Sequence, residues 1–348
     1  MLKIGTLNNT AKSRILLSAR LFYRGVNISP LLFICIFLLY SCGGGSSSQE
    51  TVNNENNTIN SNNELNENCI NTSRQGLQRC DLEHDGIDRY YFIYSPQNND
   101  ASLNLPILLA LHGYGSSAQN HYSYTNYFPI ADQNNFIVLY PQGSPMQTNL
   151  ASSSSHWNVG GWTIGSSVDD ISFIDKVLNL VKNKTSINES RIYSSGMSNG
   201  GFMSYHLACK LSNRIAAIAS VTGSMTPETF DDCDPKHPTA ILQIHGARDL
   251  VVPYSGLSYM KSIPDSIEYW SNVNGCNNEP NVAIIDDFEN NFSITETEYL
   301  NCLSNVSVKL LYHSTMGHTW PASNTFGISA SSEVWNFVSQ YNLFGKIN

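Results

Sequence analysis

Short apolar runs alternate with segments of helical periodicity along most of this 348-residue chain. The most continuous run, residues 105–111, reads Leu-Pro-Ile-Leu-Leu-Ala-Leu, which is typical of a strand buried on both faces. Residues 169–182 instead place apolar residues three and four positions apart after two aspartates, which predicts a helix. The predicted strands are 89–94, 105–111, 136–140, 191–195, 215–221, 240–244 and 306–312, and the predicted helices are 169–182, 202–211 and 332–341. This alternation predicts an α/β fold with a mostly parallel central sheet and helices on both faces.

The first 41 residues differ in composition from the rest of the chain. They contain five basic residues and no acidic residue, and an apolar run over residues 31–40 ends at Ser41-Cys42. A positive segment before an apolar run too short to span a bilayer is typical of an export signal. Residues 39–42, Leu-Tyr-Ser-Cys, resemble a bacterial lipobox, which implies cleavage before Cys42 and acylation of its thiol. We therefore expect a lipoprotein signal peptide over residues 1–41, with plain secretion as the alternative.

Residues 42–68 are rich in Gly, Ser and Asn and carry little apolar surface, so we expect a disordered tether. The remaining residues, 69–348, are sufficient for one domain with a sizeable core. We expect the domain to be exported to the periplasm or cell surface and to meet the membrane only through the lipid. Loss of the signal changes the formal charge from −9 to −14, because it removes five positive charges and no negative ones. Such an acidic chain offers no basic surface for nucleic acid.

Six cysteines remain once Cys35 in the signal and the lipid candidate Cys42 are set aside. An even number in an exported chain favours three disulfides over metal ligation. The absence of a Cys-x-x-Cys spacing also disfavours a zinc site, and we expect no metal. Six cysteines allow fifteen connectivities. Sequence proximity favours the pairs Cys69–Cys80, Cys209–Cys233 and Cys276–Cys302.

A Gly-x-Ser-x-Gly motif, Gly196 to Gly200, lies between the predicted strand 191–195 and the predicted helix 202–211. Ser and Gly are common in loops, so the motif alone is a weak signal. Its position between a strand and a helix matches a nucleophile elbow, in which a tight turn lifts a serine hydroxyl above the sheet edge. A Cβ at Gly196 or Gly200 would collide in so sharp a turn. We therefore predict that Ser198 is a nucleophile.

A serine nucleophile needs a base and an acid that orients the base. In the α/β-hydrolase order, each follows the serine in a loop after a later strand. Asp249 meets this condition for the acid, because it follows the predicted strand 240–244 directly. A loop salt bridge with Arg248 is the purely structural alternative. The competing acids, none of which follows a buried strand so directly, are Asp265, Asp286 and Asp287.

His318 is the predicted base, because it lies in a loop after the last core strand, 306–312. His313 is the rival. It is closer to the end of the strand, which is more typical of a packed structural residue.

The negative oxygen of an acyl-transfer intermediate needs two backbone N–H donors, one after the nucleophile and one from an earlier strand-end loop. The donor after the nucleophile is predicted to be the main-chain N–H of Asn199. The donor from the earlier loop is predicted to be the main-chain N–H of Tyr114, in the glycine-rich stretch 111–117. Trp157 precedes another glycine-rich loop and is predicted to line the substrate pocket, although simple packing explains it equally well. Trp320 is predicted to form a second apolar wall of that pocket.

Six motifs together resemble a known family: Leu-His-Gly-Tyr-Gly-Ser-Ser (111–117), Tyr-Pro-Gln-Gly (140–143), Trp-Asn (157–158), Asp-Asp-Ile-Ser-Phe-Ile (169–174), Gly-Met-Ser-Asn-Gly-Gly (196–201) and Gly-His-Thr-Trp-Pro (317–321). They are similar to the polyhydroxybutyrate depolymerase and feruloyl esterase group of secreted serine esterases. The resemblance covers most of residues 85–340. It implies an α/β-hydrolase fold, a triad of Ser198, Asp249 and His318, and ester hydrolysis without metal or cofactor. It also supports the Cys209–Cys233 pair.

We therefore expect a serine carboxylesterase that forms an acyl-enzyme. The expected substrates are feruloyl- or acetyl-type polysaccharide esters or hydroxyalkanoate oligomers. The alternatives are a serine peptidase on the same scaffold and a non-catalytic surface-binding lipoprotein.

Overall fold

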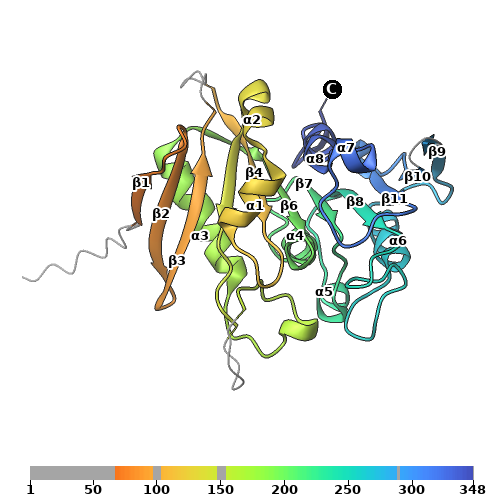
Figure 1. Ribbon diagram of the computed structural model, residues 1–348, viewed down its shortest axis with the longest axis horizontal. Helices are drawn as coiled ribbons and strands as arrows, with labels where there is room; N and C mark the ends of the chain where they lie inside the picture. The colour runs from red at the N-terminus through yellow and green to blue at the C-terminus, as the bar shows by residue number, and fades with distance from the viewer. Residues whose placement is uncertain (1–66, 97–102, 147–153, 288–290, 348) are drawn as a thin grey trace, which may run out of the picture. The chain divides into compact units, whose positions relative to one another are not determined.

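The computed structural model describes residues 67–96, 103–146, 154–287 and 291–347 (Figure 1). The predicted signal peptide, Cys42 and nearly all of the predicted tether lie outside the described residues. Strand β1 begins at Glu67, so the boundary predicted for the tether, residue 68, is two residues too late. Among the helices that the structure describes, none combines the length and the apolar character that a membrane span requires.

One large mixed sheet organises the described part of the chain, with the strand order β1-β2-β3-β5-β4-β6-β7-β8-β11-β10-β9. The six strands from β5 to β11 in this order are parallel, and antiparallel strands flank them on both sides. The strands are β1 (Glu67–Asn71), β2 (Leu77–His84), β3 (Ile87–Tyr94), β4 (Leu105–Leu111), β5 (Ile137–Pro141), β6 (Ile187–Met197), β7 (Ala217–Val221), β8 (Ala240–Gly246), β9 (Asn281–Asp287), β10 (Phe292–Tyr299) and β11 (Val308–His313). A separate short hairpin joins β12 (Tyr341–Asn342) to β13 (Gly345–Lys346).

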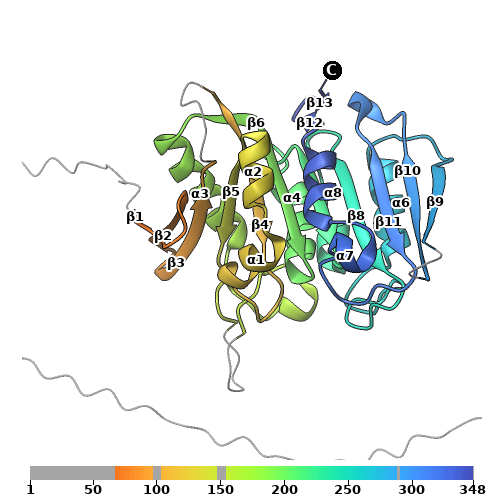
Figure 2. The ribbon, with the colours of Figure 1, turned by 45° about the horizontal axis from the view of Figure 1, so that its top comes forward.

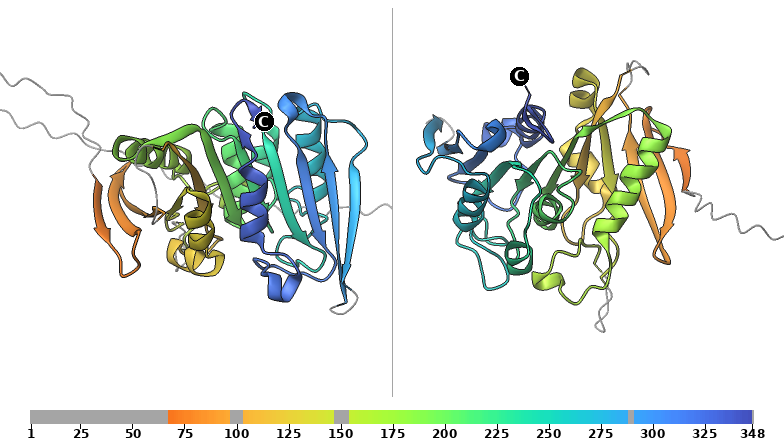
Figure 3. Two further views of the ribbon diagram at one scale, coloured as in Figure 1. Left: turned by 90° about the horizontal axis from the view of Figure 1, so that it is seen from above. Right: turned by 180° about the vertical axis from the view of Figure 1, so that it is seen from behind.

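Helices cover both faces of the sheet, as the sequence predicts. They are α1 (Ala118–Thr125), α2 (Phe128–Asn134), α3 (Asp170–Lys184), α4 (Asn199–Lys210), α5 (Pro227–Asp231), α6 (Ile263–Val273), α7 (Ser323–Phe326) and α8 (Ala330–Val338), with short 3₁₀ turns η1 (Gly161–Thr163) and η2 (Leu303–Asn305). Helices α1, α2 and α8 contribute to one hydrophobic core and lie in front of the sheet in Figure 2. Helices α3, α4 and α6 contribute to the core on the opposite face, where Figure 3 shows α3 from behind.

Most of the central strands are buried along their whole length. Every residue of β4, β5, β7 and β8 is buried, which fits sequences made mostly of apolar residues. All predicted strands and helices are present, with ends shifted by a few residues. Helix α4 begins at Asn199, three residues earlier than predicted, because the chain turns from β6 into the helix without a connecting loop.

The six cysteines of the described domain form three disulfides: Cys69–Cys80, Cys209–Cys233 and Cys276–Cys302. This confirms the predicted pairing. Cys69 and Cys80 are opposite each other on β1 and β2, so the first disulfide fixes the register of the N-terminal strand.

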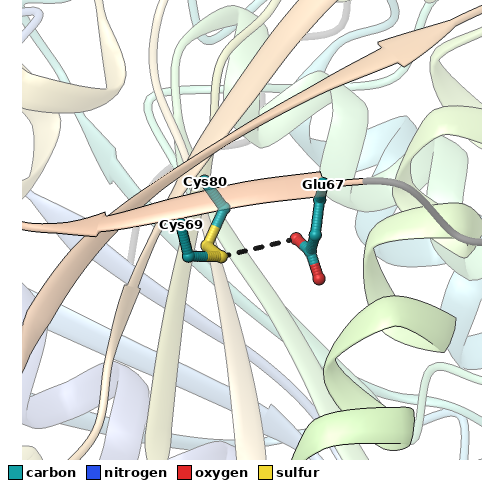
Figure 4. A group of neighbouring side chains, drawn as sticks. All are labelled: Glu67, Cys69 and Cys80. Carbon is teal, nitrogen blue, oxygen red and sulfur yellow. Dashed lines mark hydrogen bonds between the residues drawn. A yellow bond between two sulfur atoms is a disulfide. The ribbon is translucent and has the colours of Figure 1, made fainter.

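Glu67 lies beside the Cys69–Cys80 disulfide (Figure 4). Its Oε2 is 3.7 Å from the Sγ of Cys69, and its Oε1 is paired with Nζ of Lys184 at 2.6 Å. A disulfide sulfur has neither a proton to donate nor the thiolate charge that binds metals. The two cysteines therefore offer no thiolate ligand to a metal here, and the carboxylate acts as the partner of a lysine.

Candidate active site

Ser198 occupies the turn between β6, which ends at Met197, and α4, which begins at Asn199. Its backbone has φ 54° and ψ −123°, a conformation that non-glycine residues rarely adopt. The Ser198 N–H donates to the carbonyl oxygen of Val221 at the end of β7, at 2.9 Å. The neighbouring parallel strand thus holds the turn in its strained form, as expected of a nucleophile elbow.

The elbow is possible only because Gly196 and Gly200 lack a side chain. A Cβ at Gly196 would lie 2.3 Å from the main chain of Gly200. A Cβ at Gly200 would in turn lie 2.1 Å from the carbonyl oxygen of Leu111. Both glycines that the motif predicted are therefore required by backbone contact. Gly113 is not constrained in this way, because the nearest atom to a Cβ there would be the Ser198 Cβ at 3.4 Å, an ordinary van der Waals distance.

Asp249 follows β8, and its carboxylate is buried. One oxygen, Oδ1, accepts the N–H groups of Val251 and Val252 at 2.9 and 2.8 Å. The other, Oδ2, is 2.8 Å from Nδ1 of His318. Burial alone would raise the pKa of the Asp249 carboxyl, but the hydrogen bonds from His318 and Val252 outweigh it and hold the pKa below its ordinary value. The carboxylate is therefore ionised at neutral pH.

His245, near the end of β8, stabilises the loop that carries Asp249. Its Nε2 is 2.9 Å from the carbonyl oxygen of Val252, and its Nδ1 is 3.1 Å from Nε2 of Gln243. Burial lowers the pKa of His245, so the ring is neutral, donates to Val252 and accepts from Gln243. No separate signal in the sequence indicated this role, because His245 simply follows the predicted strand 240–244.

The two candidate histidines have different surroundings. His318 lies in the loop after β11 and keeps 19% of its side chain exposed. His313 is fully buried, where its Nδ1 accepts the N–H groups of Thr315 and Met316 and its Nε2 lies 3.2 Å from the carbonyl oxygen of Phe326. His313 is thus a packed residue that shapes the loop carrying His318.

The structure joins Asp249 to His318, while Ser198 lies at the carboxyl end of β6. Within the described residues, no hydrogen bond connects the Ser198 hydroxyl to the His318 imidazole. The competing acid Asp265 is exposed in the first turn of α6, and Asp286 and Asp287 lie on β9 at the outer edge of the sheet.

The two predicted oxyanion donors come from different elements of the fold. Asn199 is the first residue of α4, and Tyr114 follows β4. Within the described residues, neither main-chain N–H donates to another group, as expected for donors available to a ligand. The Gly115 N–H donates to the carbonyl oxygen of Ser155 at 2.8 Å, which fixes the turn that contains Tyr114.

His112 anchors the start of this loop. Its Nε2 accepts the N–H of Gly143 at 2.9 Å, and its Nδ1 is 2.8 Å from the carbonyl oxygen of Gly113. Complete burial lowers the pKa of His112 to about 4, so the ring is neutral at physiological pH. The two contacts require the proton on Nδ1. His112 therefore holds the loop in place and is not positioned as a proton carrier.

Residues 92–271, more than half of the chain, match the family model of phospholipases and carboxylesterases. The chain belongs to this family. The match includes the elbow and Asp249, but it ends before His318.

Two relatives of this carboxylesterase-family chain are named as esterases. The bifunctional acetylxylan esterase/xylanase XynS20E of Neocallimastix patriciarum is 28% identical over 264 residues, which cover 76% of this chain and 35% of that protein. Feruloyl esterase B of Piromyces equi is 28% identical over 250 residues, which cover 68% of this chain and 42% of that protein. This chain therefore spans well under half the length of either relative.

A solved structure described as FAE has a TM-score of 0.50 at 12% identity, covering 75% of this chain and 88% of that chain. At this identity the likeness concerns the fold alone. Together with the family match, it confirms the predicted α/β-hydrolase fold.

The two predicted pocket tryptophans of this carboxylesterase-family chain have different positions. Trp157 is completely buried and its Nε1 donates to the carbonyl oxygen of His112, so the prediction that it lines the substrate pocket is wrong. A side chain without accessible surface cannot touch a substrate. Trp320 is partly exposed and lines a cavity of about 300 Å³ together with Tyr124 and Ile130.

Proposed function

We propose that this chain is a serine carboxylesterase with Ser198 as nucleophile, His318 as general base and Asp249 as the residue that orients the base. The observation that carries the proposal is the 2.8 Å hydrogen bond between Asp249 and His318, made by loops that follow β8 and β11. The strained elbow of Ser198 follows β6 in the same parallel sheet. Carboxyl ends of parallel strands meet at one edge, where this fold family carries its chemistry.

The reaction follows from these roles. The Ser198 Oγ attacks the ester carbonyl carbon while Nε2 of His318 takes its proton. The N–H groups of Tyr114 and Asn199 stabilise the negative oxygen of the tetrahedral intermediate. The intermediate then expels the alcohol, which receives the proton from His318. Water attacks the acyl-enzyme with the same assistance from His318, releasing the carboxylic acid and restoring the Ser198 hydroxyl.

Asp249 selects the form of the imidazole that can act as base. Its ionised Oδ2 accepts a hydrogen bond from the Nδ1–H of His318, which leaves the lone pair of Nε2 available. The contact between Ser198 and His318 is expected to form when substrate binds, because such catalytic hydrogen bonds are often long in unliganded enzymes.

The relatives suggest the class of ester. They are named for acetylxylan and feruloyl esters, and we propose that this chain acts on the same kinds of acyl group attached to polysaccharide. The predicted lipid anchor at Cys42 would hold the domain at the cell surface or in the periplasm.

A hydrolysis panel on the full-length protein tests this function. It should compare methyl ferulate, acetylated xylan, short-chain p-nitrophenyl esters, hydroxybutyrate oligomers and a peptide p-nitroanilide, with a Ser198→Ala variant as control. We expect turnover of the first three that is lost in the variant. Turnover of a peptide p-nitroanilide without ester hydrolysis would favour a peptidase instead, and no turnover of any substrate would favour a binding protein.

A further inference from the structure

Trp157 links two segments that are far apart in the sequence. Its indole Nε1 donates to the carbonyl oxygen of His112, at 2.9 Å. Its main-chain N–H donates to Oδ1 of Asn199 at 2.7 Å, and Nδ2 of Asn199 donates to its main-chain carbonyl oxygen at 3.1 Å. The three residues are completely buried. Hydrogen bonds shielded from water in this way hold their partners more firmly than exposed ones do.

Each end of this link lies at a proposed oxyanion donor. Asn199 carries one donor on its own main chain, and His112 is two residues before Tyr114, which carries the other. The side chain of Asn199 is held by two bonds to a single peptide segment, so its backbone has little freedom to rotate. The bond from the indole fixes the carbonyl group of His112 at the point where the chain leaves β4.

We propose that Trp157 is a positioning residue that sets the spacing between the Tyr114 and Asn199 N–H groups, and so controls kcat without touching substrate. This inference rests on the proposed esterase function. This role also accounts for a tryptophan at a buried position, because the bond to His112 requires a long side chain with a donor at its far end. The bonds to Asn199 use only the main chain of Trp157. Other apolar side chains of similar size lack the donor.

Trp157→Phe is the direct test, because it keeps an aromatic ring but removes the N–H that reaches His112. We expect kcat for a p-nitrophenyl ester to fall about 10- to 100-fold with KM within about twofold of wild type. Loss of one oxyanion donor costs about 10²–10³ in kcat, and a misplaced donor should cost somewhat less. The KM is expected to hold because the oxyanion exists only in the transition state.

Trp270→Phe is the matched control. Trp270 is also completely buried, but it lies in α6 and its Nε1 has no hydrogen-bond partner within the described residues. The two variants make the same chemical change in equally buried sites. We expect Trp270→Phe to leave kcat and KM unchanged, and the melting temperature of each variant shows whether both remain folded.

Asn199→Ala provides a second test if Trp157→Phe does not fold. It removes both side-chain bonds to Trp157 but keeps the main-chain donor, and we expect the same selective fall in kcat. A kcat within twofold of wild type in a folded Trp157→Phe variant would overturn the proposal, as would a rise in KM alone. Failure of the esterase proposal itself would look different, because Ser198→Ala would then match wild type.

Discussion

Replacing Asp249 by asparagine tests how the imidazole of His318 is oriented. The asparagine oxygen should keep the place of Oδ1, because two main-chain N–H groups, from Val251 and Val252, point at it from 2.9 and 2.8 Å. The new NH₂ group must then face Nδ1 of His318, where the carboxylate oxygen now lies at 2.8 Å. Two donors cannot face each other, so Nδ1 must become the acceptor and the ring proton must move to Nε2.

This change of tautomer removes the base. With the proton on Nε2, the nitrogen proposed to face Ser198 has no lone pair to accept its proton. In serine proteases the equivalent substitution lowers kcat by about 10⁴-fold, which corresponds to about 5.5 kcal/mol of transition-state stabilisation. We expect a loss of the same order for Asp249→Asn, with little change in KM.

The assay is initial-rate hydrolysis of a p-nitrophenyl ester by wild type and variant at equal concentrations of folded protein. Asp265→Asn is the matched control, because it makes the same substitution at an exposed acid in the first turn of α6. It should leave kcat unchanged. A kcat for Asp249→Asn within about tenfold of wild type would refute the reasoning about the tautomer.

Three further predictions concern the scaffold. Gly200→Ala should lower the free energy of unfolding, measured in urea, by about 3 kcal/mol or more, because the new Cβ would lie 2.1 Å from a main-chain oxygen. Gly317→Ala is the control, because the nearest neighbour of its Cβ would be 3.6 Å away, and its free energy of unfolding should stay within about 1 kcal/mol of wild type. Replacing Cys209 and Cys233 by serine should lower the free energy of unfolding by about 3 kcal/mol, since the disulfide closes a loop with a sequence separation of 24 residues; an unchanged melting temperature would contradict this. Burial lowers the pKa of His112 from 6.5 to about 4, so between these pH values the unfolded chain binds a proton that the folded chain excludes. The free energy of unfolding should therefore fall by up to about 3 kcal/mol as the pH decreases through that interval. A free energy of unfolding, measured in urea, that did not change from pH 7 to 4.5 would refute this prediction.

The sequence was sufficient to predict the residues that follow buried strands. Ser198 comes directly after β6, Asp249 comes three residues after β8, and His318 comes five residues after β11. In a parallel sheet such positions converge on one edge, so chain order alone predicts their proximity. Gly196 and Gly200 were predictable for a related reason, since the sharpness of the turn limits what can occupy it.

The role of Trp157 could not be predicted in the same way. Its position before a glycine-rich loop indicated an aromatic near the site. Its placement instead depends on a side-chain bond to His112 and a main-chain bond to Asn199, which are 45 and 42 residues away along the chain. Edge elements were missed for a different reason. Strand β1 is short, polar and largely exposed, so no continuous apolar run marks it.

The central claim is that Ser198 becomes covalently acylated during turnover. Incubation of the full-length protein with a fluorophosphonate, followed by proteolysis and mass spectrometry, tests it most directly. The account predicts one adduct, on the peptide that contains Ser198, formed at a rate that falls steeply in the Asp249→Asn variant. An active protein that remained unlabelled at Ser198, or that carried its adduct on another serine, would contradict the account.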